Sequence, residues 1–209
     1  TKGNGVISNE QNRYSDYQNA FPRIKELASE FESPVLVLLM RWDQHGPWLP
    51  PYCWPPSGSM ESFLKLRDLL HASGNYFGVY CSGTAFTINS LISDYNIEQE
   101  FEEKQLARHM TSNTEGAVRS TMQGIREQSH LCITEDWGRN IILDQVRKIA
   151  ESGVDYIQYF DQNYGAMNYP CYSLEHNHPP IPGEWMTSSM LKLIDDLNNL
   201  SKEINQIRK

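Results

Sequence analysis

The sequence predicts an α/β fold, a TIM-type (β/α) barrel that is incomplete within these 209 residues. Strand-like and helix-like segments alternate along the chain, which is typical of a parallel sheet covered by helices. The loops after the expected strands are long and polar, whereas those before them are short, as in barrels whose active site lies at the carboxyl ends of the strands. Three βα units are clear and a fourth is open, but a complete barrel takes about 250 residues. We therefore expect a fragment of a longer barrel protein.

The first half of the chain shows two helix–strand pairs. Apolar residues at helical spacing predict a helix over 16–31, and the continuous apolar run VLVLLM at 35–40 suits a parallel strand buried on both faces. A second helix is expected at 59–73, with Gly74 as its stop. The run YFGVYC at 76–81 predicts the second strand.

The second half is less regular. Residues 84–130 are polar and broken, and we expect a short strand and an excursion loop there. Thr134 is the expected N-cap of a helix that runs to about Ser152. The apolar run VDYIQYF at 154–160 predicts another buried strand, and 186–207 is a strongly periodic helix.

Size and charge exclude several classes of protein. The length suits one well-buried domain, so residues 1–209 are expected to form one partial catalytic barrel, with 1–15 as a flexible or connecting segment. A net charge of −8 argues against binding to nucleic acid or to an anionic membrane. No apolar run approaches the ~20 residues of a transmembrane helix. The chain opens with TKGNG and no initiator Met, so we expect it to be a piece of something longer.

The four cysteines predict neither a metal site nor a disulfide framework. Cys53, Cys81, Cys132 and Cys171 are widely spaced and contain no CxxC motif. We expect buried free thiols, and we expect no metal and no cofactor.

Polar and aromatic side chains follow the expected strands. Carboxylates, amides, imidazoles and indoles together suit sugar, because sugar rings stack on aromatic faces and hydroxyls take directed hydrogen bonds. The candidate substrate-binding residues are Trp42, Asp43, His45, Trp48, Trp54, Gln162, Asn163, His176 and His178. Two alternatives stay open: Asp43 can pair with Arg41, and the Pro/Trp loop can pack upon itself.

Asp161 is the first candidate for a catalytic carboxylate. A carboxylate at the end of a buried strand is partly desolvated, and Gln162 and Asn163 can orient it, which suits a nucleophile that attacks an anomeric carbon. A loop-capping Asp is the alternative. Glu175 and Glu184 are the in-chain candidates for the second catalytic carboxylate.

His176 and His178 form an HNH motif in the loop after that strand. They can contact sugar, make structural hydrogen bonds or supply two metal ligands. No second His pair and no bridging Lys accompanies them, so sugar contact and structural bonding are favoured over metal.

Several motifs occur in the order found in a known family. GVDYIQYFDQ at 153–162, followed by C…EHNHPP…W at 171–185, resembles bacterial glycosidase-like barrel proteins of largely unassigned function. These are distant relatives of the endo-α-N-acetylgalactosaminidases. The segments 41–56, 63–83 and 131–142 resemble earlier units of the same barrels.

The resemblance implies retaining hydrolysis of α-glycosides on a (β/α)₈ barrel, with Asp161 at the position of the nucleophile. It also implies a general acid/base Glu at the end of the next strand. The residues after Asp161 are taken up by the His loop and the last helix, so this Glu is expected beyond residue 209. The present chain alone is then expected to be inactive, and a carbohydrate and the rest of the parent chain are its expected partners. A secreted or periplasmic location follows from the resemblance alone.

Two other functions stay open. One is a non-catalytic barrel that binds carbohydrate without cutting it. The other, less favoured, is a metal-dependent hydrolase that uses His176 and His178.

Overall fold

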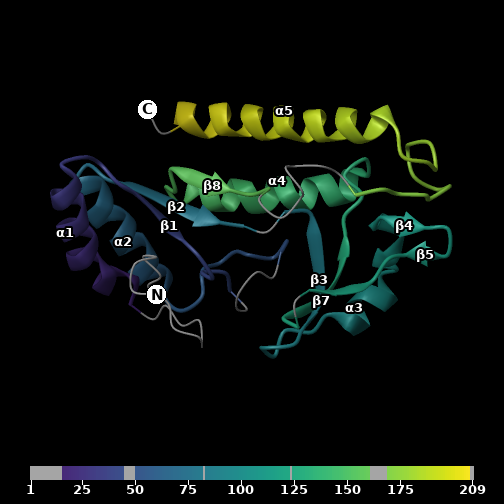
Figure 1. The fold of residues 1–209 in the computed structure, drawn as a ribbon, viewed down its shortest axis with the longest axis horizontal. Helices are drawn as coiled ribbons and strands as arrows, with labels where there is room; N and C mark the ends of the chain where they lie inside the picture. Colours follow the sequence, from purple (N-terminus) through teal and green to yellow (C-terminus); the bar gives the residue numbers. More distant parts are fainter. Residues whose placement is uncertain (1–15, 45–49, 82, 123, 161–168, 208–209) are drawn as a thin grey trace.

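Helices and parallel strands alternate in the computed structural model, which describes residues 16–44, 50–81, 83–122, 124–160 and 169–207 (Figure 1). These elements are, in chain order, the 3-10 helix η1 (Tyr17–Ala20), α1 (Phe21–Phe31), β1 (Leu36–Leu39), α2 (Met60–Ala72), β2 (Tyr76–Tyr80), α4 (Asp136–Glu151), β8 (Tyr156–Gln158) and α5 (Glu184–Ile207). The predicted alternation is thus confirmed. None of the helices described is long and apolar enough to cross a membrane.

The three parallel strands lie in the order β1-β2-β8. Leu36 pairs with Tyr76, and Gly78 pairs with Tyr156, so β2 is the central strand. Among the described residues this sheet has three strands and does not close into a barrel. Figure 1 shows α5 lying along α4, with α1 and α2 at the other end of the molecule.

One face of this sheet is covered by helices and the other is partly open. Phe77 points to the helices, since its ring lies 4.9 Å from that of Phe63 in α2. On the opposite face Leu36, Tyr76 and Tyr156 are 47%, 55% and 46% exposed. The prediction that 35–40 is buried on both faces is therefore met only in part, because Leu36 is exposed whereas Leu39 is buried. In β2, Gly78 and Tyr80 lie on the same face as Tyr76 and are buried.

The segment 84–130, whose sequence pattern was the least clear, folds as a small antiparallel unit beside the parallel sheet (Figure 1). Its elements are β3 (Ala85–Ser90), α3 (Glu98–Glu103), the 3-10 helix η2 (Leu106–His109), β4 (Ser112–Asn113), β5 (Gly116–Ala117), β6 (Ser120–Met122) and β7 (Arg126–His130). The strand order is β3-β7-β6, with β4 and β5 as a separate pair. Only one short strand was predicted, because buried polar residues such as Thr87, Gln128 and Ser129 hide the apolar pattern of these strands.

Two helix boundaries test the local predictions. Ser59 caps α2 by accepting a hydrogen bond from the Ser62 backbone N–H at 3.2 Å, and Gly74 ends this helix region with a φ of 75°. Thr134 is not the N-cap of α4, because that position belongs to Glu135. The Thr134 hydroxyl lies instead 3.1 Å from the Cys132 sulfur.

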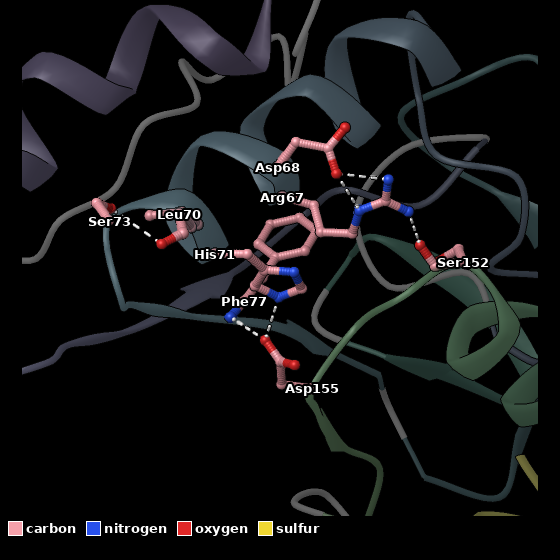
Figure 2. A network of polar contacts seen from close by, with 8 residues as sticks. All are labelled: Arg67, Asp68, Leu70, His71, Ser73, Phe77, Ser152 and Asp155. Carbon is pink, nitrogen blue, oxygen red and sulfur yellow. Dashed lines mark hydrogen bonds and ion pairs between the residues drawn. The ribbon is translucent and has the colours of Figure 1, made fainter. Parts of the chain in front are cut away.

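A network of polar contacts joins α2 to the amino ends of β2 and β8 (Figure 2). The Asp155 carboxylate accepts from the Phe77 backbone N–H at 2.8 Å and from His71 Nε2 at 2.7 Å. Arg67 donates to the backbone carbonyl of Ser152. These contacts fix the sheet at the end opposite to the strand ends considered next.

Candidate functional site

Several predicted site residues lie outside the part of the chain that the structure describes. They are Asp161, Gln162, Asn163, His45 and Trp48. The structure does describe the chain up to Phe160, which follows β8, and it shows Tyr159 to be buried. It also describes the carboxyl ends of β1 and β2, which a parallel sheet brings to the same edge as that of β8.

Asp43 lies buried just beyond β1, with only 3% of its surface exposed. Its carboxylate acts on Arg126 of β7, which is buried as well. Burial lowers the pKa of Arg126 to about 10, while the negative charge of Asp43 works in the opposite direction. Arg126 Nε also donates to Gln128 Oε1 at 2.6 Å. The structure thus gives Asp43 a cationic neighbour that the sequence did not single out.

Further polar groups surround this pair. The ring of His130 stacks on that of Tyr169, with 3.6 Å between the ring centroids. Burial, and then the charge of Arg126, lowers the pKa of His130 to about 4, so its imidazole is neutral at pH 7. Burial also raises the pKa of Tyr159, and the neighbouring Cys53 and Cys81 raise it further.

We call this group the strand-end cluster. Its members are Asp43, Cys53, Tyr80, Arg126, His130, Tyr159 and Tyr169, which are linked by the electrostatic and ring contacts above. Within the described residues, the Tyr159 hydroxyl and His130 Nδ1 are buried without a hydrogen-bond partner. Buried polar atoms of this kind are uncommon, and a bound water or ion is one explanation for them. The cluster thus contains a phenol and an imidazole whose hydrogen-bonding capacity is not used by the described residues.

The two described tryptophans of the Pro-rich loop serve packing. Trp42 is fully buried, and its indole N–H donates to the Tyr80 carbonyl at 2.7 Å. Its ring packs against those of Trp54 and Phe63, at 6.3 and 6.0 Å between centroids, and these two rings also contact each other. Trp54 is half-buried against the same core. No face of the Trp42 ring is exposed in this structure, so a sugar ring cannot stack on it. Trp42 is part of the core beside the strand ends.

The in-chain candidates for a second catalytic carboxylate lie on the surface. Glu175 is exposed in the loop before α5, and its backbone N–H is bonded to the Ser173 hydroxyl at 3.2 Å. Glu184 is exposed as the first residue of α5. Neither belongs to the strand-end cluster.

His176 and His178 are brought together with two cysteines, Cys132 and Cys171. The sequence did not predict this group. The local signal was the spacing Cys171-x4-His176-x-His178, but Cys132 comes from a distant segment that only the fold brings close. All four cysteines of the chain are buried, and none forms a disulfide.

Solved structures with the same fold are glycosidases. The α-N-acetylgalactosaminidase NagBb from Bifidobacterium bifidum, in its GalNAc complex, matches with a TM-score of 0.67 and 16% identity, over 89% of this chain and 28% of that chain. The α-galactosidase TtGalA from Thermus thermophilus, in complex with p-nitrophenyl α-D-galactopyranoside, matches with a TM-score of 0.60 and 17% identity, over 90% of this chain and 34% of that chain.

The chain therefore has the fold of part of a glycosidase, and it spans about a third of the length of these proteins. By sequence it belongs to the family described as a domain of unknown function, DUF6259, whose model matches residues 7–207. No curated protein matches the chain.

Proposed function

We propose that this chain is part of a glycoside hydrolase domain that cleaves glycosidic bonds of an oligo- or polysaccharide with retention of configuration. The observation that carries the proposal is the strand-end cluster, in which buried polar groups gather at the carboxyl ends of three parallel strands. The fold shared with two kinds of α-glycosidase supports it. The substrate is then a carbohydrate, and the proposed location of the protein is secreted or periplasmic.

Asp161 is the proposed nucleophile. It follows Phe160 in the sequence, immediately after the last described residue beyond β8. In a retaining mechanism its carboxylate attacks the anomeric carbon while an acid protonates the leaving oxygen. A glycosyl-enzyme ester forms, and water then hydrolyses it with the same acid group acting as base. Gln162, Asn163 and Asp43 are proposed to bind the sugar hydroxyls.

The general acid/base is proposed to lie on a further strand of the parent protein. Among the described strands β8 is an edge of the sheet, and a groove of about 470 Å³ separates it from α5. Leu36, Tyr76 and Tyr156, at the starts of the three strands, are about half exposed, and Tyr76 also lines this groove. Both features fit a barrel that more strands complete. Glu175 remains the in-chain alternative.

The test uses the longest natural protein that contains this chain. We expect Asp161→Asn to abolish release of nitrophenol from p-nitrophenyl α-glycosides while sugar binding survives. Asp161→Gly should be inactive as well, and added azide should restore cleavage by replacing the missing nucleophile. Asp68→Asn is the matched control, because this carboxylate lies on the surface of α2. Retained activity of Asp161→Asn would falsify the assignment of the nucleophile.

A non-catalytic carbohydrate-binding barrel is the competing function. It is favoured by the position of Glu175 and Glu184, both exposed and outside the strand-end cluster. In that case glycans bind to the wild-type protein, but no reducing ends appear at any pH. Asp161→Asn would then leave the behaviour of the protein unchanged.

A further inference from the structure

Four side chains that suit a zinc ion meet at one place outside the strand-end cluster. They are Cys132, Cys171, His176 and His178, here called the thiol–imidazole cluster. Cys132 lies between β7 and α4, whereas the other three come from the loop before α5. We propose that this cluster binds a structural zinc ion that holds the loop before α5 against the antiparallel unit.

The distances between the donor atoms fit a tetrahedral site. Bonds of about 2.3 Å to sulfur and about 2.05 Å to nitrogen place ligand atoms about 3.6 Å apart for S···N and about 3.8 Å apart for S···S. The Cys132 sulfur lies 3.4 Å from His178 Nε2, and the Cys171 sulfur lies 3.3 Å from His176 Nδ1. All four donor atoms lie within 4.8 Å of one another. A zinc ion therefore fits with donor-atom shifts of up to about 1 Å.

Both imidazoles are held in the tautomer that a metal needs. His176 Nε2–H donates to the Arg108 carbonyl at 2.7 Å, which leaves the lone pair of Nδ1 directed into the cluster. His178 Nδ1–H donates to the Pro179 carbonyl at 2.7 Å, which leaves the lone pair of Nε2 directed there. Such bonds to the remote nitrogen are the usual support of metal-binding histidines. The ring of His178 is further fixed by stacking on Trp185, with 3.8 Å between centroids.

The two thiols lie in different surroundings. The backbone N–H of Ser112 donates to the Cys171 sulfur at 3.4 Å. The hydrogen bond that the two cysteines share lowers the pKa of the Cys171 thiol and, together with burial, raises the pKa of the Cys132 thiol. Both sulfurs are buried, and His176 is only 9% exposed. Three of the four side chains are thus shielded from water, and His178 is partly buried.

The donor set identifies the metal and its role. Two thiolates and two imidazoles suit zinc, whereas calcium and magnesium require oxygen ligands. Four protein ligands fill a tetrahedral zinc site and leave no open position for a catalytic water. The cluster therefore supports a structural ion and not a metal-dependent hydrolase that uses His176 and His178.

The loop gives a physical reason for such an ion. Its described part, 169–183, contains no helix and no strand. Two of its largest apolar side chains, Leu174 and Ile181, are 86% and 62% exposed, so the loop buries little apolar surface. A metal can supply the folding free energy that a small core lacks. The ion would tie this loop to the segment between β7 and α4, from which Cys132 comes.

The first experiment measures the metal content of the wild-type protein, purified under reducing conditions without chelators. We expect about one zinc ion per chain, since one closed four-ligand site is present. Replacement by Co²⁺ should give the intense sulfur-to-cobalt charge-transfer absorption that reports thiolate ligands. This readout needs no variant, so it decides the question even where a variant does not fold.

Variants then locate the site. Cys171→Ser and His178→Gln should each lower zinc affinity by more than about 100-fold, since loss of a mere supporting partner costs about 10–100-fold. Cys81→Ala is the matched control, because Cys81 is buried, unoxidised and a member of neither cluster. It should bind zinc like the wild type.

Three results would overturn the proposal. One is a protein without zinc that also binds no Co²⁺ through sulfur. Another is a Cys132–Cys171 disulfide, seen by mass spectrometry of the protein as isolated. The last is zinc that all of the variants retain. None of these results concerns Asp161 or sugar cleavage. The zinc site and the proposed activity are therefore tested independently of each other.

Discussion

His71 Nε2 lies 2.7 Å from the Asp155 carboxylate, and the same carboxylate accepts the backbone N–H of Phe77. The pair joins the last turn of α2 to the residue that precedes β8. A single carboxylate thus fastens a helix and two neighbouring strands at the amino ends of the strands.

Asp155→Ala is expected to lower the free energy of unfolding by about 1–3 kcal/mol, because it leaves a part-buried N–H without its acceptor. Urea unfolding of the variant and the wild type measures this. Asp68→Ala is the control, since its ion pair with Arg67 is largely exposed and is expected to contribute about 0–1 kcal/mol. Equal losses in the two variants would contradict the role of Asp155.

Acid should weaken the contact between α3 and the residues before β6. Arg119 donates to Glu98 at 2.6 Å, and this hydrogen bond lowers the pKa of Glu98 below its usual 4.5. The folded state therefore releases this proton more readily than the unfolded chain. The pair stabilises the fold above pH 4.5, and this contribution is lost as the pH falls below that value.

Because both side chains are about 40% exposed, we expect only about 0.2–1 kcal/mol from this pair. A double-mutant cycle with Glu98→Gln and Arg119→Gln, measured at pH 7 and at pH 3, isolates the contribution. The coupling should shrink at the lower pH and at high salt. A coupling that is the same at both pH values would rule the pair out as its source.

Gly78→Val should destabilise the central strand. A Cβ at this position would already lie 3.2 Å from the Tyr156 carbonyl oxygen and 3.2 Å from Leu36 Cδ1. The larger side chain forces the strands apart, at a cost of about 1–3 kcal/mol. Thermal unfolding measures it. Gly183→Ala is the control, because its added Cβ meets Trp185 at an ordinary 3.6 Å. A neutral Gly78→Val would mean that Leu36 and the Tyr156 carbonyl do not lie this close to Gly78.

Trp42→Phe should lower stability and leave sugar affinity unchanged. The variant loses the indole N–H that bonds the Tyr80 carbonyl, and it leaves a cavity in the core, together costing about 1–3 kcal/mol. Calorimetric titration with sugar and urea unfolding separate the two effects. A several-fold loss of sugar affinity at unchanged stability would show instead that Trp42 stacks on the sugar.

Removal of metal should loosen the loop before α5. In a strong chelator we expect a lower melting temperature and new protease cleavage near Leu174 and Ile181, the exposed apolar residues of this loop. Added zinc should reverse both effects. Cys171→Ser should show the cleavage without chelator. Identical cleavage patterns with and without metal would mean that no ion holds this loop.

The sequence predicted those elements whose apolar pattern is strong. The periodic helix that became α5 and the apolar runs that became β1 and β2 are examples. The strand β7 was missed, because its residues REQSH are all polar and three of them are buried through side-chain hydrogen bonds and charge. Arg126, at its first position, was missed as a site residue for the same reason.

The thiol–imidazole cluster could not be predicted from spacing alone. Three of its members are close in sequence, but Cys132 lies 39 residues before Cys171. The antiparallel unit and α4 bring them together, and neither the strand pairing of that unit nor its position was visible in the sequence. Long-range placement, and not side-chain chemistry, was the missing information.

The contacts of Figure 2 lie at the amino ends of the strands, whereas the strand-end cluster lies at the carboxyl ends. The two sets share no residue. The contacts that join α2 to the sheet and the proposed site thus lie at opposite ends of the same strands. Substitutions that stabilise the protein could therefore be made around Arg67, His71 and Asp155. The carboxyl ends of the strands would then remain available for redesign toward a different ligand.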